Sequence, residues 1–167
     1  MLIDEDLRVR HALKQMDAAI AVLYQAIDAT IFDFIKDCRL ERRDCRHEIA
    51  RRHGKGQHYS QAVLLYRVHR ANIDLSWSRI WYLRGSNIPR YKRIPCSKGA
   101  VHLARLRSKA HPDEVDLILR HEAQARAYRE LNARIKKIWN EKDRLAARFD
   151  VLTGTGNLLR RKDDEAR

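Results

Sequence analysis

Arginines, lysines and aromatic residues are interleaved in the middle of this chain, and side chains of these types can bind a nucleic acid. Guanidinium and ammonium groups bind phosphates, and aromatic rings stack on unpaired bases. Arg79 shares the parity of Trp77 and Trp81, two tryptophans that we expect to face a core, so the role of Arg79 stays open. The candidate nucleic-acid-binding residues are Arg79, Arg84, Arg90, Tyr91, Lys92, Arg93, Lys98, Arg105, Arg107 and Lys109.

The positive charge of the chain is concentrated around these candidates. The net charge is +13 at pH 7, and residues 67–109 carry eleven basic side chains against one acidic side chain, Asp74. A solvated helix face usually mixes both signs, as residues 110–167 do with thirteen basic and eleven acidic side chains. A block of cations repels itself unless a polyanion covers it. The distribution therefore favours a nucleic acid, DNA first, over an acidic protein, an anionic membrane or simple solubility.

A histidine motif and a cysteine pair lack the spacing of a metal site. His121 and Glu122 begin like the zinc protease motif, but Ala125 stands where the second histidine would be. Cys38 and Cys45 would lie about 10 Å apart along a helix, too far for two zinc–sulfur bonds of about 2.3 Å. We therefore expect neither a metal nor another cofactor.

Three carboxylates, Asp33, Asp37 and Glu41, follow one another at intervals of four, as the metal-binding residues of a nuclease could. Lys36 and Arg39 lie beside them, so a solvated helix face with ion pairs explains the pattern better. No His-x-His cluster accompanies the six tyrosines to support strand transfer. The sequence therefore predicts a protein that is not an enzyme and does not nick DNA itself.

A long helix is predicted for residues 1–53. Apolar residues between Val9 and Phe34 recur in steps of three and four, which is the pattern of a coiled-coil seam. Gly54 follows the helix, and glycine readily adopts the left-handed conformation that ends one.

Residues 54–110 are predicted to contain a short helix, a basic β-hairpin and a basic connector. The dense apolar residues of Ser60–Ala71 predict the short helix, although they show no clean face. Polar and apolar residues then alternate over 72–83, turn residues follow at 84–87, and 88–94 can pair back, which predicts the hairpin. A helix continuing through the first of these strands is the alternative.

A second long helix is predicted for residues 111–152, and residues 153–167 are predicted to be a loose tail. Pro112, Asp113 and Glu114 suit the first turn of a helix. The fold class is therefore mainly α with a small β-hairpin, in which two long coiled-coil-like helices flank the basic hairpin and connector. Because these helices are too long for one small core to cover, we expect a homodimer.

The cysteines and the first residues bear on location. Three cysteines are an odd number without dense spacing, which fits the reduced thiols of a cytoplasm. The acidic residues after Met1 do not resemble a signal peptide, and no apolar run approaches 18 residues. We therefore expect a cytoplasmic protein that does not enter a membrane.

Three segments occur in an order that resembles the MobI-type auxiliary proteins of conjugative plasmids and integrative conjugative elements. They are Ser76-Trp-Ser-Arg-Ile-Trp-Tyr-Leu, the basic strand Arg90-Tyr-Lys-Arg-Ile-Pro, and the helix from Glu114 to Ile138. The likeness covers about residues 76–138, and Pro112 and Asp113 depart from it, since the family tends to have a tryptophan before the acidic residue that opens this helix. The resemblance implies a bacterial accessory factor that acts at an origin of transfer and helps a separate relaxase to begin DNA mobilisation. No catalytic residue carries over.

Two other functions stay open. The chain could be a coiled-coil adaptor or structural protein whose basic block binds an acidic protein partner or RNA. A small nuclease is the third possibility.

Overall fold

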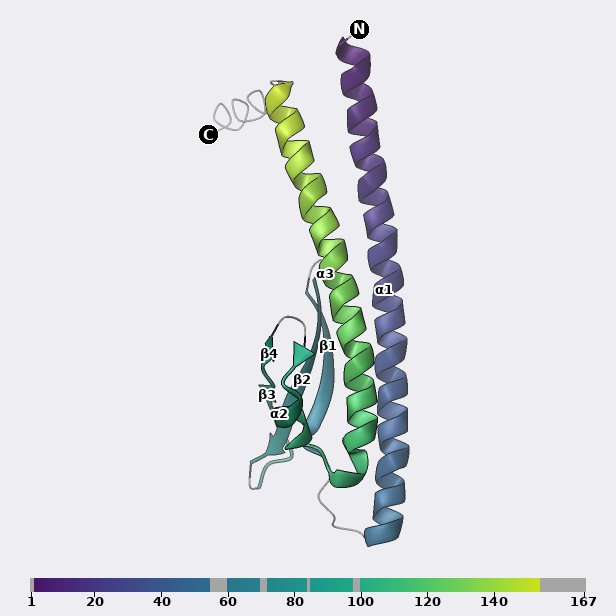
Figure 1. Ribbon diagram of the computed structural model, residues 1–167, viewed down its shortest axis with the longest axis vertical. Coiled ribbons are helices and arrows are strands. Elements are labelled where there is room, and N and C mark those ends of the chain that lie inside the picture. The colour runs from purple at the N-terminus through teal and green to yellow at the C-terminus, as the bar shows by residue number, and fades with distance from the viewer. Residues whose placement is uncertain (1, 55–59, 70–71, 84, 98–99, 154–167) are drawn as a thin grey trace. The chain divides into compact units, whose positions relative to one another are not determined.

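The computed structural model describes residues 2–54, 60–69, 72–83, 85–97 and 100–153. Two compact units form: Ile27–Asn132, which we call the sheet unit, and Met1–Ala26 with Ala133–Arg167, the helical unit. Helix α1 spans Leu2–His53 and helix α3 spans Val115–Leu152, so each contributes residues to both units (Figure 1). Both predicted long helices are confirmed, whereas the predicted tail lies outside the described residues except for Thr153.

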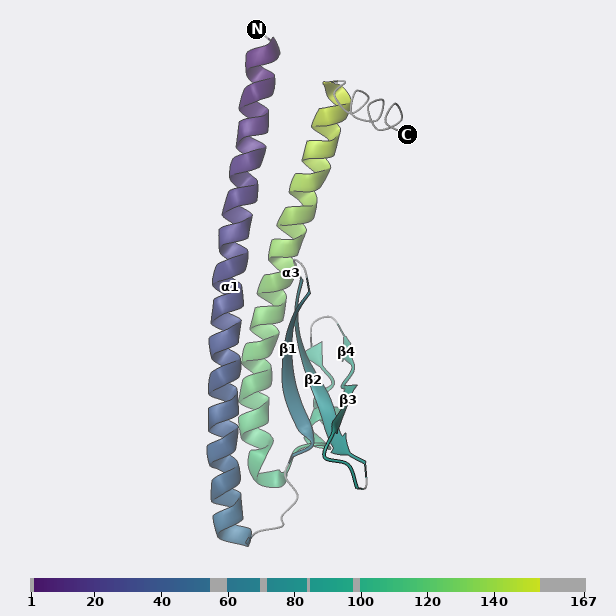
Figure 2. The ribbon, with the colours of Figure 1, turned by 180° about the vertical axis from the view of Figure 1, so that it is seen from behind.

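Three antiparallel strands form the main sheet of the sheet unit, in the order β1-β2-β3. They are β1 (Ala62–His69), β2 (Asn72–Tyr82) and β3 (Pro89–Arg93), and both ribbon views show β1 and β2 beside α3 in this unit (Figures 1 and 2). The predicted hairpin is confirmed as β2 and β3. In its turn Gly85 has a φ of 76°, and the Ser86 N–H donates to the Leu83 carbonyl at 3.0 Å.

The short helix predicted for Ser60–Ala71 is wrong, because this segment contains strand β1. All eight residues of β1 pair with β2 in a continuous register, from Ala62 opposite Arg79 to His69 opposite Asn72. Ala62 and Leu64 are buried on one side of the strand and Val63 is half-buried on the other. Apolar residues on both faces conceal the period of two, so the sequence alone did not separate a strand from a helix.

Short elements connect the sheet to α3. Strands β4 (Cys96–Ser97) and β5 (Ala100–Val101) pair with each other, and helix α2 (Leu103–Arg107) follows, so the connector is partly helical. A 3-10 turn, η1 (Pro112–Glu114), then begins the second long helix as predicted. The ring of His111 accepts a hydrogen bond from the backbone N–H of Asp113 at 3.3 Å and so caps this turn.

Glu122 of α3 is the buried polar centre of the sheet unit. Its carboxylate accepts from the indole Nε1 of Trp77 at 2.8 Å, from the backbone N–H of Val101 at 3.2 Å and from the guanidinium of Arg129. Trp77 is fully buried. One carboxylate thus joins β2, β5 and α3. The three donors satisfy its two oxygen atoms, which burial would otherwise leave unpaired.

Side chains of α3 also donate hydrogen bonds to backbone carbonyls of β2, in the part of β2 that does not pair with β3. Strand β3 pairs with β2 only over Ser78–Tyr82. Beyond it, Arg129 donates to the Leu75 carbonyl at 3.3 Å, and the Asn132 amide donates to the Ile73 carbonyl at 3.0 Å. The sheet is therefore attached to α3 by hydrogen bonds as well as by apolar packing.

In the helical unit, α1 and α3 make direct contacts. The rings of Tyr24 and Trp139 meet edge to face at 6.4 Å, and the ammonium group of Lys142 lies 2.5 Å from a carboxylate oxygen of Asp17. Hydrogen bonds to Asp143 and Asp17 raise the pKa of Lys142. This pairing explains how a lysine can be buried between the two helices.

Only some of the apolar residues along the two long helices are buried within one chain, so the structure of one chain does not establish the predicted coiled coil. Ile20 and Ile135 are buried, whereas Leu23 is 51% exposed and Ile138 is 49% exposed. Helix α1 is also long and apolar enough to cross a membrane, with a window of mean hydropathy 1.6, which corrects the expectation of no apolar stretch of this length. The core helix of a soluble protein can have the same composition; 28% of this window is buried, and Ile31 of α1 is fully buried in the sheet unit.

Replacing Glu122 by alanine is expected to lower the free energy of unfolding by about 3–5 kcal/mol, because it leaves the buried indole of Trp77 and the backbone N–H of Val101 without their acceptor and removes the carboxylate partner of Arg129. Urea unfolding followed by circular dichroism measures the change. Glu130→Ala is the matched control, since it removes an exposed carboxylate of the same helix that pairs with Arg126 four residues away. The control should cost about 0.5 kcal/mol or less, and equal losses in the two variants would contradict the role of Glu122.

Candidate nucleic-acid interface

The outer part of the hairpin presents three cations and one tryptophan on a single face. Residues directly opposite in an antiparallel pair point to the same side of a sheet, and so do residues two apart in a strand. Arg79 lies opposite Lys92, and Trp81 lies opposite Arg90, so all four side chains share one side. We call Arg79, Trp81, Arg90 and Lys92 the hairpin face.

The three cations of the hairpin face are exposed and make no ion pair with a carboxylate of the described residues. The Nε of Arg79 donates to the side-chain oxygen of Gln61 at 2.8 Å, and its guanidinium carbon lies 6.0 Å from the centre of the Trp81 ring. Both contacts orient Arg79 and leave its charge uncompensated. The position of Arg79, which the sequence left open, is therefore on the exposed face beside Arg90 and Lys92.

The two tryptophans of β2 differ in burial although they share one side of the sheet. Trp77 is in the core, as predicted. Trp81 is only half-buried, four residues further along the strand, where the cations of the hairpin face surround it. Its ring is therefore placed to contact a ligand that the cations attract.

Tyr91 and Arg93 point to the opposite side of the hairpin. Tyr91 lies opposite Ile80 and Arg93 opposite Ser78, which places both residues away from the hairpin face. The guanidinium of Arg93 lies 2.8 Å from a carboxylate oxygen of Asp74, the acidic residue within 67–109. Arg93 is thus a weaker candidate than the sequence suggested, because its charge is already paired.

The end of the connector meets the start of β1, next to the hairpin face. The carbonyl of Lys109 accepts from the backbone N–H groups of Gln61 and Ala62, at 2.7 and 3.2 Å, and Ala62 is the residue opposite Arg79. Arg105 and Arg107 are exposed on α2. The structure therefore brings the end of the connector to the edge of the hairpin, while Arg84 and Lys98 lie outside the described residues.

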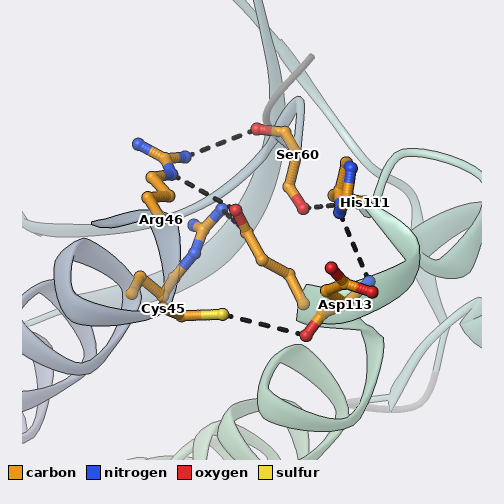
Figure 3. A network of polar contacts seen from close by, with 7 residues as sticks. Cys45, Arg46, Ser60, His111 and Asp113 are labelled. Carbon is orange, nitrogen blue, oxygen red and sulfur yellow. Dashed lines mark hydrogen bonds and ion pairs between the residues drawn. The ribbon is translucent and has the colours of Figure 1, made fainter. Parts of the chain in front are cut away.

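A second group of cations lies on the C-terminal half of α1, within the sheet unit. Arg42 and Arg46 hold the fully buried carboxylate of Glu114, at 3.0 and 3.3 Å. Arg46 also donates to the Ser60 carbonyl at 3.5 Å, and the Ser60 hydroxyl accepts from the His111 N–H at 2.6 Å. Figure 3 shows this network, in which α1 is joined to the start of β1 and to η1.

The pKa values in this region reflect burial and charge together. Burial alone would raise the pKa of Glu114, but a hydrogen bond from Ser60 and the charges of Arg42 and Arg46 outweigh it, so the pKa is lowered. Burial, with a smaller contribution from Glu41, raises the pKa of the Cys38 thiol to about 12. Cys38 is therefore a protonated thiol at neutral pH, with little nucleophilic character.

The sequence reasoning missed the role of the α1 arginines. Arg39, Arg42, Arg43 and Arg46 follow the apolar seam at spacings of three and four, so they continue along one face of the helix. That spacing was visible, but the strand they face was predicted as a helix. Within the described residues, no group of three or more histidine, cysteine, aspartate and glutamate side chains is arranged to hold a metal. No family model, curated protein or solved structure matches this chain.

Glu114→Gln is expected to lower the free energy of unfolding at neutral pH by about 3 kcal/mol, because it removes the partner of two arginines. The Glu114 contribution is fully present above the unfolded-state pKa of about 4.5 and is lost as the pH falls through the lowered folded-state pKa. The difference between the variant and the wild type should therefore shrink below about pH 4.5. Urea unfolding at several pH values measures it, and Glu141→Gln, at an exposed site, is the control. A difference that does not change with pH would contradict this assignment.

Proposed function

We propose that this protein is a DNA-binding accessory protein whose hairpin face contacts the nucleic acid. The observation that carries the proposal is the exposure of Arg79, Arg90 and Lys92 on one side of the sheet, around the half-buried Trp81. Such a group of uncompensated cations repels itself in the free protein, and its binding to phosphates is favourable because it releases the counterions condensed on the DNA. The proposed activity is binding, without nicking of DNA by this chain.

The form of the hairpin fits two ways of contacting DNA. A two-stranded antiparallel ribbon can enter the major groove of a duplex, with its arginines on phosphates or guanine edges. The Trp81 ring, with Arg79 on one side, also suits stacking on an unpaired base. Both modes use the same cations, so a loss of these cations affects both.

The resemblance to MobI-type auxiliary proteins extends this proposal to a cellular role. In that role the protein is cytoplasmic, binds near an origin of transfer, and assists a relaxase that performs the nicking. Two of the three segments that carry the resemblance, 76–83 and 90–95, include the whole hairpin face. The part of the chain that would contact DNA thus lies within the region that resembles the family.

We also propose that the protein is a homodimer through its long helices. The supporting observation is the exposure of alternate seam positions in the helical unit, among them Met16, Leu23, Ile138 and Leu145. Exposure of apolar residues at this spacing to water is unfavourable. Their burial against a second copy of the chain would stabilise a dimer. Sedimentation velocity is expected to give twice the chain mass of 19.7 kDa, and a monomer at about 10 µM would contradict the proposal.

Neutralising the hairpin face is expected to weaken DNA binding on the order of a hundredfold at about 50 mM salt, since three phosphate contacts are removed. The variant is Arg79→Gln, Arg90→Gln and Lys92→Gln together, and fluorescence anisotropy with a labelled duplex measures the affinity.

The matched control replaces Arg134, Lys136 and Lys137 by glutamine, which removes the same charge from exposed positions of α3. The control is expected to bind within a few-fold of the wild type. Equal losses in both triple variants would show that net charge alone governs binding. Unchanged binding in the first variant would assign the hairpin face to another partner, such as an acidic protein, and a stronger effect on an RNA duplex would replace DNA by RNA.

A further inference from the structure

The sheet unit contains a cavity of about 430 Å³ that has an apolar wall and a cationic wall. Its volume is in the range of small-molecule sites. Its described lining residues include neither aspartate nor glutamate. The apolar wall is formed by Ile35, Cys38, Val63, Leu64 and Trp77, and the polar wall by Arg39, Arg42, Arg43, Arg46, His47 and His121. We call it the arginine cavity.

Two buried nitrogen atoms of residues that line the arginine cavity have no hydrogen-bond partner among the residues that the structure describes. They are Nε of Arg42 and Nδ1 of His121, and both residues are more than nine-tenths buried. Arg42 contacts Glu114 through Nη2, which leaves Nε unused. An unpaired buried polar atom destabilises the folded protein, so a ligand that supplies the missing partner would recover that free energy.

The two unpaired nitrogens have different hydrogen-bonding character. Nε of Arg42 is a donor. Burial, opposed by Glu41, lowers the pKa of His121, so the ring is neutral at pH 7. Its Nε2 lies 3.0 Å from a carboxylate oxygen of Glu41, which can only accept, so Nε2 carries the hydrogen and Nδ1 is an acceptor. Two residues that line the arginine cavity thus carry one unpaired buried donor and one unpaired buried acceptor.

The charge around the cavity suits an anion with more than one negative charge. Glu114 compensates Arg42 and Arg46, and Asp44 lies 3.4 Å from the exposed guanidinium of Arg43. Arg39 makes no ion pair with any carboxylate of the described residues. A phosphate matches the planar fork of a guanidinium and can engage two such groups at once.

We propose that the arginine cavity binds a phosphorylated nucleoside, with its phosphate on Arg39 and Arg43 and its base against Val63, Leu64 and Trp77. A free nucleotide and an unpaired nucleotide of a DNA strand present the same chemistry. If the ligand is a nucleotide of a DNA strand, the proposal rests on the proposed function. Binding of a free nucleotide does not depend on that function.

Isothermal titration calorimetry with deoxyadenosine 5′-monophosphate tests the proposal, with deoxyadenosine and inorganic phosphate as separate probes. The wild type is expected to bind the nucleotide with a Kd below about 1 mM, and each part alone at least about tenfold more weakly. A 5′-phosphorylated single-stranded oligonucleotide should compete with the nucleotide if a strand is the source. A lack of competition with retained nucleotide binding would assign the site to free nucleotides.

Two variants separate the cationic wall from the apolar wall. Arg39→Gln with Arg43→Gln should weaken nucleotide binding at least about tenfold, because two phosphate contacts are lost. Val63→Phe fills part of the arginine cavity without removing a cation and should weaken binding similarly. The control, Arg51→Gln with Arg52→Gln, makes the same charge change on exposed residues of α1 that pair with Glu48, and should bind like the wild type. Thermal unfolding verifies that each variant is folded.

The outcome is independent of the test of the hairpin face. The variant with Arg79, Arg90 and Lys92 replaced should keep its nucleotide affinity. Absence of nucleotide binding by the wild type, or equal binding by the Arg39 and Arg43 double variant, would overturn the proposal. Duplex binding through the hairpin face could still hold in either case, so the two failures are distinguishable.

Discussion

The arrangement of the sheet unit depends on one buried carboxylate. Glu122 binds the indole of Trp77, the backbone of Val101 and the guanidinium of Arg129, and so fixes β2 and β5 on α3. A buried charge is tolerated only when its hydrogen bonds are complete, which makes this position intolerant of substitution. Because Trp77 is anchored, the following residues of β2 extend beyond the core, and Arg79 and Trp81 become available at the surface.

The same constraint produces two cationic regions with different character. Along one side of β2, the residues change from core to surface within two positions, from Trp77 to Arg79. The hairpin face has exposed cations and suits a long polyanion. The arginine cavity combines exposed and buried arginines with an apolar wall, and suits a small organic phosphate. On α1, the charges of Arg42 and Arg46 are compensated by Glu114. Arg39 does not bind Glu114, so its charge remains available for a ligand.

Local patterns predicted most of the fold, and long-range contacts explain what they missed. The alternation over 72–83 and the turn at Gly85 predicted the hairpin because one strand face is polar where it is exposed. Strand β1 was missed because both of its faces are apolar. The hairpin cations were predicted from charge density. Which face of the sheet each cation occupies depends on the strand register, which places Arg93 and Lys92 on opposite faces. The arginine cavity depends on contacts between segments far apart in the sequence, and no local pattern encodes these contacts.

The central claim is that the cations of the hairpin face and connector displace counterions from DNA. The dependence of the DNA affinity on salt concentration tests it most directly. With six or more phosphate contacts, the affinity should fall about a thousandfold or more between about 50 and 200 mM salt, a slope of about −5 or steeper in the logarithmic plot. The variant without the hairpin-face cations should show a slope that is smaller by about 2.7. An affinity that hardly changes with salt, or an identical slope for both proteins, would contradict the account.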